Sequence, residues 1–371
     1  MLKYDDDTKL GKMIAELCPD GVEYLPLGQV CDTLKKGTLK TDQLQENGLY
    51  PVINSGRDFY GRYESFNNEG NAITIAARGE YAGFITYISE RFWAGGLCYP
   101  YRSKNENKLS TRFLYHYLKG NESHIMNSMV ARGSIPALNK ADVDKIIIPL
   151  PPLAVQQEIV RILDSFTELT AELTAELTAR RKQYEYYRDQ LLTFGDEVPK
   201  LALGEVCTFK YGKGNNIPSE HGKYPVYGCN GIVSTTNTFN SEDSPIIGHI
   251  GSAGVVNWGA GKHFVTYNGT ICSANDKLAD SKYIYHVLCS LRLQRFVKGS
   301  QPFLSYGDFS REKISVPPIE IQKNIVSILD HFDTLCDDLT SGLPAEIAAR
   351  QKQYEYYRDK LLTFEQQKGD I

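Results

Sequence analysis

ARRKQYEYYRDQLLTF (179–194) and ARQKQYEYYRDKLLTF (349–364) are two copies of one sequence, identical at fourteen of sixteen positions and 170 residues apart. Just before each copy, PPLAVQQEIVRILDSF (151–166) matches PPIEIQKNIVSILDHF (317–332). An internal repeat of this length indicates an architecture built from two copies of one unit. The chain is therefore predicted to be a tandem pseudo-dimer.

The stretches between the matching tails have diverged. LGQVC (27–31) still faces LGEVC (203–207), and RFLYHYL (112–118) still faces KYIYHVL (282–288). Most of the remaining sequence keeps only such anchor residues. A duplicated scaffold with two divergent inserts predicts two modules of one shape that recognise two different things.

Both tails are predicted to form long helices, because their apolar residues recur at steps of three and four. The first begins at the prolines 151–152 and ends at Gly195, and it contains the short repeat TEL-TAEL-TAEL-TA (167–179). The second runs from about Ile321 to Phe364, with an interruption expected near Gly342 and Pro344. We expect the two apolar stripes to pack against each other as an antiparallel coiled coil.

The inserts contain short β-branched and aromatic runs between glycines and asparagines, a pattern typical of small sheets. Each insert closes with a shorter helix, predicted from Ser110 or Thr111 to Leu118 and from Ser281 to about Lys298. The predicted class is α+β, with two globular domains in a pseudo-twofold arrangement separated by two long antiparallel helices. The predicted segments are 1–148 (first globular domain), 149–194 (central helix), 195–314 (second globular domain) and 315–371 (carboxyl-terminal helix).

Composition excludes several classes of protein. The 371 residues carry a net charge of −4, which argues against a chain that coats nucleic acid by positive charge alone. Divided by predicted segment, however, the two globular domains sum to +2 and the helical segments to −6. The amino end lacks a signal-peptide core, no stretch is apolar enough to span a membrane, and the scattered cysteines suit reduced cytoplasmic thiols. The 24 tyrosines favour recognition surfaces.

A search for catalytic chemistry finds little. The chain lacks a Walker motif, an Asn-Pro-Pro-aromatic motif and histidines at metal-binding spacing. Asp142, Asp144 and Lys145 resemble a nuclease cluster only faintly, and their repeat partner lacks the pattern, so a capped turn is the better interpretation. We expect no catalytic residue, no metal site and no cofactor in this chain.

Loops near the start of each module combine amide, cationic and aromatic side chains, the groups that read base edges and hold phosphates. The predicted DNA-binding residues of the first module are Lys35, Lys36, Lys40, Asn54, Ser55, Arg57, Tyr60, Arg62, Arg78, Tyr81, Arg132 and Ser134. Those of the second module are Lys210, Tyr211, Lys213, Asn215, Asn216, Asn230, His249, Ser252, Lys298, Ser300 and Gln301.

The paired tails, the TAEL repeats and the opening ELCPDGVEYLPLGQV (16–30) resemble the DNA specificity (S) subunit of type I restriction-modification enzymes, of the TAEL-bearing kind. The resemblance covers essentially the whole chain. It implies two target recognition domains that each read one half of a bipartite, asymmetric site in double-stranded DNA. It also implies that the helices set the gap between half-sites and dock two methyltransferase (M) subunits.

The resemblance further implies that restriction (R) subunits join through the core of M and S subunits. It places S-adenosylmethionine, ATP and Mg²⁺ on the partner subunits. Two alternatives stay open from the sequence: a methyltransferase fused to its own recognition domains, and a coiled-coil adaptor whose modules bind protein or glycan. A methyltransferase that co-purifies with the chain would favour the S-subunit interpretation over the adaptor.

Overall fold

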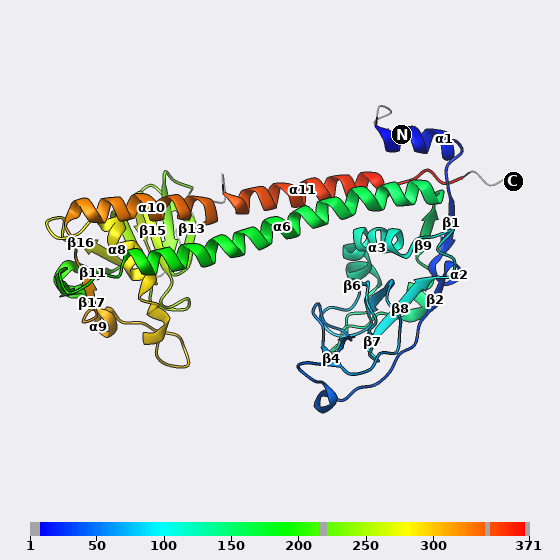
Figure 1. The fold of residues 1–371 in the computed structure, drawn as a ribbon, viewed down its shortest axis with the longest axis horizontal. Helices are drawn as coiled ribbons and strands as arrows, with labels where there is room; N and C mark the ends of the chain where they lie inside the picture. Colours follow the sequence, from blue (N-terminus) through cyan, green and yellow to red (C-terminus); the bar gives the residue numbers. More distant parts are fainter. Residues whose placement is uncertain (1–7, 215–220, 338–341, 368–371) are drawn as a thin grey trace. The chain divides into compact units, whose positions relative to one another are not determined.

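The computed structural model describes residues 8–214, 221–337 and 342–367. The chain forms two compact units, which we call the first unit (Met1–Glu172 with Ala348–Ile371) and the second unit (Leu173–Ile347). Each unit contains one predicted globular segment together with parts of both predicted helical tails (Figure 1). Within the described residues, no helix is long and apolar enough to cross a membrane.

The first unit is a mixed α/β structure. Its strands are β1 (Glu23–Pro26), β2 (Cys31–Thr33), β3 (Tyr50–Ile53), β4 (Gly61–Tyr63), β5 (Ala72–Ala76), β6 (Ile85–Ile88), β7 (Trp93–Ala94), β8 (Cys98–Ser103) and β9 (Ile147–Leu150). Its shorter helices are α1 (Lys9–Leu17), α2 (Leu27–Val30), η1 (Thr41–Gln43), α3 (Thr111–Gly120), α4 (Glu122–His124), η2 (Ile125–Met129) and α5 (Lys140–Val143). The strands form sheets in the orders β2-β8-β5-β6, β4-β3-β7 and β1-β9.

The second unit repeats this plan. Its strands are β10 (Lys200–Ala202), β11 (Cys207–Tyr211), β12 (Tyr224–Gly228), β13 (Gly231–Thr236), β14 (Ser241–Gly248), β15 (Val256–Val265), β16 (Gly269–Ala274) and β17 (Lys313–Ser315). Its shorter helices are α7 (Leu203–Val206), α8 (Ser281–Ser290), η3 (Leu293–Phe296) and α9 (Tyr306–Phe309). Here one sheet has the order β11-β16-β14-β15-β12-β13, and β10 pairs with β17. The predicted α+β class is confirmed.

Long helices complete both units. The first, α6 (Leu153–Leu191), is 39 residues long and follows the span that the sequence predicts. The second tail forms α10 (Ile319–Asp337) and α11 (Leu343–Leu361). The interruption predicted between them falls partly on residues 338–341, outside the described residues. Pro344 lies in the first turn of α11, where a missing backbone N–H costs no hydrogen bond.

Within each unit, the start of one tail pairs with the end of the other (Figure 1). In the first unit, Phe166 of α6 stacks on Tyr357 of α11 with ring centroids 5.5 Å apart. In the second unit, Phe332 of α10 stacks on Tyr187 of α6 at 5.8 Å. Phe166 and Phe332 are equivalent positions of the repeat, and so are Tyr187 and Tyr357. Each unit therefore combines the phenylalanine of one tail with the tyrosine of the other. The reciprocal contact is what antiparallel packing of two identical tails requires.

A buried glutamine joins each long helix to the loop before the shorter helix of the same unit. Gln156 Nε2 donates to the carbonyl oxygens of Lys108 and Pro151, both at 2.7 Å, and its Oε1 accepts from Ser110 N at 2.8 Å. Gln322 makes the equivalent bonds in the second unit, to Leu278 O, Pro317 O and Asp280 N. Both side chains are fully buried.

Both shorter helices begin at predicted residues, α3 at Thr111 and α8 at Ser281. Ser110 accepts a hydrogen bond from Phe113 N at the start of α3, and Asp280 accepts from Lys282 N at the start of α8. The predicted end of the second helix near Lys298 is wrong. Helix α8 ends at Ser290 because Arg292 adopts a left-handed conformation (φ 48°), which turns the chain and buries Leu293 in the core.

We predict that Gln156→Leu destabilises the first unit. Leucine has a similar volume, but it leaves the Lys108 and Pro151 carbonyls and the Ser110 N–H without this partner, at a cost of roughly 3 kcal/mol in the free energy of unfolding. Urea unfolding followed by circular dichroism measures this loss. Gln157→Leu is the matched control, because Gln157 is exposed on the same turn and its replacement is expected to change the free energy by less than about 0.5 kcal/mol. Equal effects of the two variants would contradict the prediction.

Candidate nucleic-acid interface

Four chain segments of the second unit converge beside the carboxyl end of β14: 211–214, 248–252, 267–268 and 298–304. His249 N donates to Asn268 O at 3.0 Å, and Tyr267 N donates to Gly214 O at 3.0 Å. Leu304 N donates to His249 O at 2.9 Å, while Lys298 and Phe303 close a hairpin with two mutual backbone bonds. These bonds connect the segments into one backbone frame.

The first unit contains the same frame. Ala77 N donates to Leu97 O at 2.8 Å, as His249 does to Asn268, and Leu138 N donates to Ala77 O at 2.9 Å, as Leu304 does to His249. Ala131 and Ala137 form the matching hairpin. The matched bonds give the two units equivalent loops beyond β5 and β14, although the hairpin closes over 131–137 in the first unit and over 298–303 in the second. We call each set of loops the unit's loop frame.

Many predicted DNA-binding residues lie on these frames. In the second unit, exposed side chains on or beside the frame are Lys210, Lys213, Lys298, Ser300 and Gln301, while Tyr211 and Ser252 are half-buried. In the first unit, Lys35, Lys36, Arg78, Arg132 and Ser134 are exposed at the matching loops, and Tyr81 follows the turn at Gly79. The structure thus brings together residues that are distant in sequence, and their contact with DNA stays a prediction.

Other predicted residues lie next to a frame. Asn54 Oδ1 accepts from Leu97 N at 2.9 Å, which places Asn54 and its neighbour Ser55 against the first frame. The Arg57 guanidinium lies over the ring of Tyr81, 4.9 Å from its centroid. Asn230 lies in the β12–β13 turn, whose Cys229 backbone packs closely against Gly248.

Three predicted residues lie at a separate loop, 40–49: Lys40 is part of it, and Tyr60 and Arg62 contact it. Tyr60 and Thr41 hydroxyls lie 3.0 Å apart, and Lys40 begins the η1 turn. Arg62 donates to the carbonyl oxygens of Gly48 and Leu49, both at 2.7 Å, so its guanidinium braces this loop. Asn215 and Asn216 lie outside the described residues.

His249 differs from the other predicted residues because its side chain is 1% exposed. Burial lowers the pKa of its imidazole below the ordinary value and favours the neutral ring. Sequence reasoning missed the exposed aromatic side chains around it, Tyr267, Phe303 and Tyr306. The high tyrosine content was a general signal for such a surface, but the residues come from three separate segments.

Each unit also contains a His–Asp pair beneath its shorter helix. His116 Nε2 lies 2.8 Å from Asp164 Oδ1, and His286 Nε2 lies 2.9 Å from Asp330 Oδ1. Arg112 adds hydrogen bonds of 2.7 and 3.0 Å to Asp164. Burial opposes ionisation of Asp164, but the bonds from His116 and Arg112 outweigh burial and lower its pKa to about 2. These pairs attach α3 and α8 to the long helices.

One cluster in the second unit contains the groups that a metal ion could use. His286, Asp330 and Asp333 each place a ligand atom within 4.8 Å of the others. However, His286 Nε2 is bonded to Asp330, and its Nδ1 lies 3.1 Å from the Tyr184 hydroxyl. Both imidazole nitrogens are therefore occupied within the protein. The equivalent of Asp333 in the first unit is Thr167, which suits a structural network better than a metal site.

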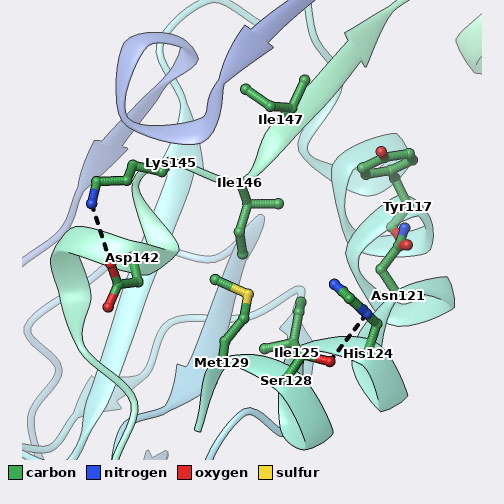
Figure 2. A pocket seen from close by; sticks show the side chains of 10 residues that line it. All are labelled: Tyr117, Asn121, His124, Ile125, Ser128, Met129, Asp142, Lys145, Ile146 and Ile147. Atoms are coloured by element: carbon green, nitrogen blue, oxygen red, sulfur yellow. Dashed lines mark hydrogen bonds and ion pairs between the residues drawn. The ribbon is translucent and has the colours of Figure 1, made fainter.

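A cavity of about 540 Å³ opens in the first unit beside α3 and η2. His124 Nδ1 and Ser128 Oγ lie 3.3 Å apart on one side, and Asp142 pairs with Lys145 at 3.3 Å on the other (Figure 2). Ile125, Met129 and Ile146 lie between them. The carboxylate is thus held by a lysine rather than by the histidine, and the arrangement does not form a nucleophile–base–acid triad.

Comparison with known proteins matches both halves of the chain. The profile of the "Type I restriction modification DNA specificity domain" matches residues 19–180 and again residues 196–349. A type I restriction enzyme specificity subunit of Haemophilus influenzae is 32% identical, over 92% of this chain and 96% of the relative. The EcoR124I/EcoR124II specificity subunit of Escherichia coli is also 32% identical, over 92% and 94%.

Solved structures share the fold. The S subunit of a type I restriction-modification system from M. genitalium has a TM-score of 0.66 with 22% identity, covering 92% of this chain and 96% of that one. A chain from a study of complex assembly and conformational transition of the type I R-M system has a TM-score of 0.55 with 17% identity. At these identities the likeness concerns the fold alone.

We predict that Asp164→Asn lowers the free energy of unfolding by about 2–3 kcal/mol at pH 7, because Arg112 and His116 lose a charged acceptor. The carboxyl has a lower pKa folded (about 2) than its ordinary value of 3.8, so its stabilisation is present above about pH 4 and is lost as the pH falls toward 2. The difference between the two proteins is expected to shrink over that interval in urea titrations. Asp142→Asn, which breaks an exposed ion pair, is the control. A difference that does not depend on pH would contradict this account.

Proposed function

The chain belongs to the family of type I restriction-modification DNA specificity subunits, and from this premise we propose that each unit reads one half of a bipartite, asymmetric site in double-stranded DNA. One observation carries the proposal: the same loop frame occurs twice, with different side chains on each copy. Equal frames place their loops equivalently on a duplex, while unequal side chains select different bases. The two half-sites are therefore expected to differ.

The exposed cations on the frames support contacts to phosphates. Lys36 and Arg78 of the first unit and Lys213 and Lys298 of the second unit are all exposed. With Lys35, Arg132 and Lys210 the frames expose seven cations, which are few for a chain with a net charge of −4, because tight DNA binding generally draws on many phosphate contacts. We infer that partner subunits supply most of the remaining phosphate contacts.

The surface of the long helices supports two copies of one partner. Tyr186 on α6 and Tyr356 on α11 occupy the same repeat position and are 62% and 63% exposed. An identical aromatic surface in both units suits two identical subunits. We propose that these partners are two methyltransferase subunits and that restriction subunits join through the resulting core. On this proposal S-adenosylmethionine, ATP and Mg²⁺ bind the partners, and the subunit itself is non-catalytic and cytoplasmic.

The TAEL segment is suited to setting the gap between half-sites. The boundary between the first and the second unit falls between Glu172 and Leu173, inside the TAEL repeat. Between Leu163 and Tyr184, both buried, every side chain of α6 is partly or fully exposed. A change of length in this part of the helix therefore alters neither core.

We predict that deleting residues 170–173 changes the gap by roughly one or two base pairs and leaves both half-sites unchanged. Four helical residues shorten α6 by about 6 Å, against about 3.4 Å per base pair of DNA. Single-molecule sequencing of methylated bases in cells that express the variant with its methyltransferase measures gap and half-sites together. Exchanging Glu172 and Glu176 for glutamine keeps the length and serves as the control. Altered half-sites with an unchanged gap would contradict the proposal.

We predict that the isolated chain does not bind S-adenosylmethionine in isothermal titration, whereas its complex with a co-purified methyltransferase does. The isolated chain is also expected to bind duplex DNA far more weakly than the complex does. Binding of the cofactor by the isolated chain would favour a fused methyltransferase. Failure to capture any methyltransferase from the host would favour the adaptor.

A further inference from the structure

Four side chains of the second loop frame and Tyr306, the first residue of α9, form one aromatic cluster. Tyr211 and His249 have ring centroids 4.6 Å apart, and Tyr267 and Phe303 approach His249 at 5.4 and 6.0 Å. Tyr306 joins through Tyr211 at 5.5 Å. We call these residues the aromatic cluster: Tyr211, His249, Tyr267, Phe303 and Tyr306.

The outer rings of the cluster face solvent. Tyr267, Phe303 and Tyr306 are 42%, 41% and 39% exposed, whereas His249 is 1% exposed. Single exposed aromatic side chains are common, but three grouped over a buried ring form a patch of the kind that marks a binding surface. The rings lie on the same segments as Lys213, Lys298 and Gln301.

The buried histidine lies at the centre of the cluster. Its Nδ1 lies 3.2 Å from the Thr270 hydroxyl, while its Nε2 is buried without a hydrogen-bond partner among the described residues. An unsatisfied buried nitrogen carries a free-energy cost that proteins seldom keep without a reason. The His249 imidazole contacts the outer rings of Tyr267 and Phe303 and is the buried platform on which they pack.

The first unit has no aromatic residue at any of the five equivalent positions. The matched frame bonds give the equivalents of His249, Tyr267 and Phe303. The pairing of β2 with β8 and of β11 with β16 gives the equivalent of Tyr211, and the first residues of α5 and α9 give that of Tyr306. The side chains of the first unit that replace the cluster are Lys35, Ala77, Gly96, Ala137 and Lys140. A similar backbone frame thus carries an apolar surface in one unit and small or cationic side chains in the other.

We propose, resting on the function proposed above, that the aromatic cluster determines part of the second unit's specificity by packing on the 5-methyl group of a thymine. In the major groove the thymine methyl is the one apolar group that a base pair presents, and it is the natural partner of ring faces that lie among amide and cationic side chains. The first unit, which has lysines and small residues at these positions, makes no such contact there.

The test uses the complete complex with its methyltransferase and duplexes in which each thymine of the second unit's half-site is replaced singly by deoxyuridine. This replacement removes the methyl and keeps the base pairing. At one position we expect roughly fivefold weaker binding, the value of one buried methyl group. The same replacements in the first unit's half-site measure the background.

Variants connect the effect to the cluster. In Tyr267→Ala and Phe303→Ala the penalty for deoxyuridine is expected to disappear, and the methylated half-site of the second unit becomes degenerate at that position. Phe239→Ala removes another exposed ring of the second unit, away from the frame, and is expected to keep the penalty. Normal assembly with the methyltransferase confirms that the variants fold.

Two results would overturn the proposal: a second half-site with no thymine-dependent position, or a deoxyuridine penalty that persists in both cluster variants. Either result leaves the proposed function standing if the methylated motif is still bipartite with two different halves. A single, continuous motif would instead contradict the proposed function itself.

Discussion

Two buried glutamine side chains, Gln156 and Gln322, are the interactions on which the rest of this fold depends. Each amide uses both of its Nε2 protons and its Oε1 atom on backbone groups from two segments. A long helix and the loop before the shorter helix are therefore joined by bonds that a residue of another shape could not make. This explains why the sequence around both glutamines stayed similar while the inserts diverged.

The His–Asp pairs extend the same constraint about two turns further along the long helices. Asp164 and Asp330 hold the histidines of α3 and α8, so each shorter helix is attached to the long helix at its start and along its length. The copies are not identical, because Tyr184 reaches His286 Nδ1 in the second unit while His116 Nδ1 has no partner among the described residues. Duplicated cores can therefore keep their geometry while individual bonds are lost.

The sequence predicted those parts of the structure that local patterns determine. The repeat, the span of α6 and the starts of α3 and α8 all have short-range signals. The end of α8 could not be predicted, because it depends on the left-handed turn at Arg292 that buries Leu293. The aromatic cluster could not be predicted either, since its members lie as far apart as Tyr211 and Tyr306 and meet only through the loop frame. His249 was predicted as a surface contact because its glycine-rich context gives no sign of burial.

The loop frame explains how two readers can diverge on one scaffold. The backbone groups of the frame form hydrogen bonds with one another. The exposed side chains that project from it are therefore not needed to hold the frame together and can change without loss of it. The exchange of Tyr267 for Gly96 between the units shows how large such a change can be. The middle of α6 can also change without affecting either unit's core, since the side chains around Glu172 contribute to neither core. On the proposed function, base selection and half-site spacing reside in separate parts of the chain, and each can vary while the other stays constant.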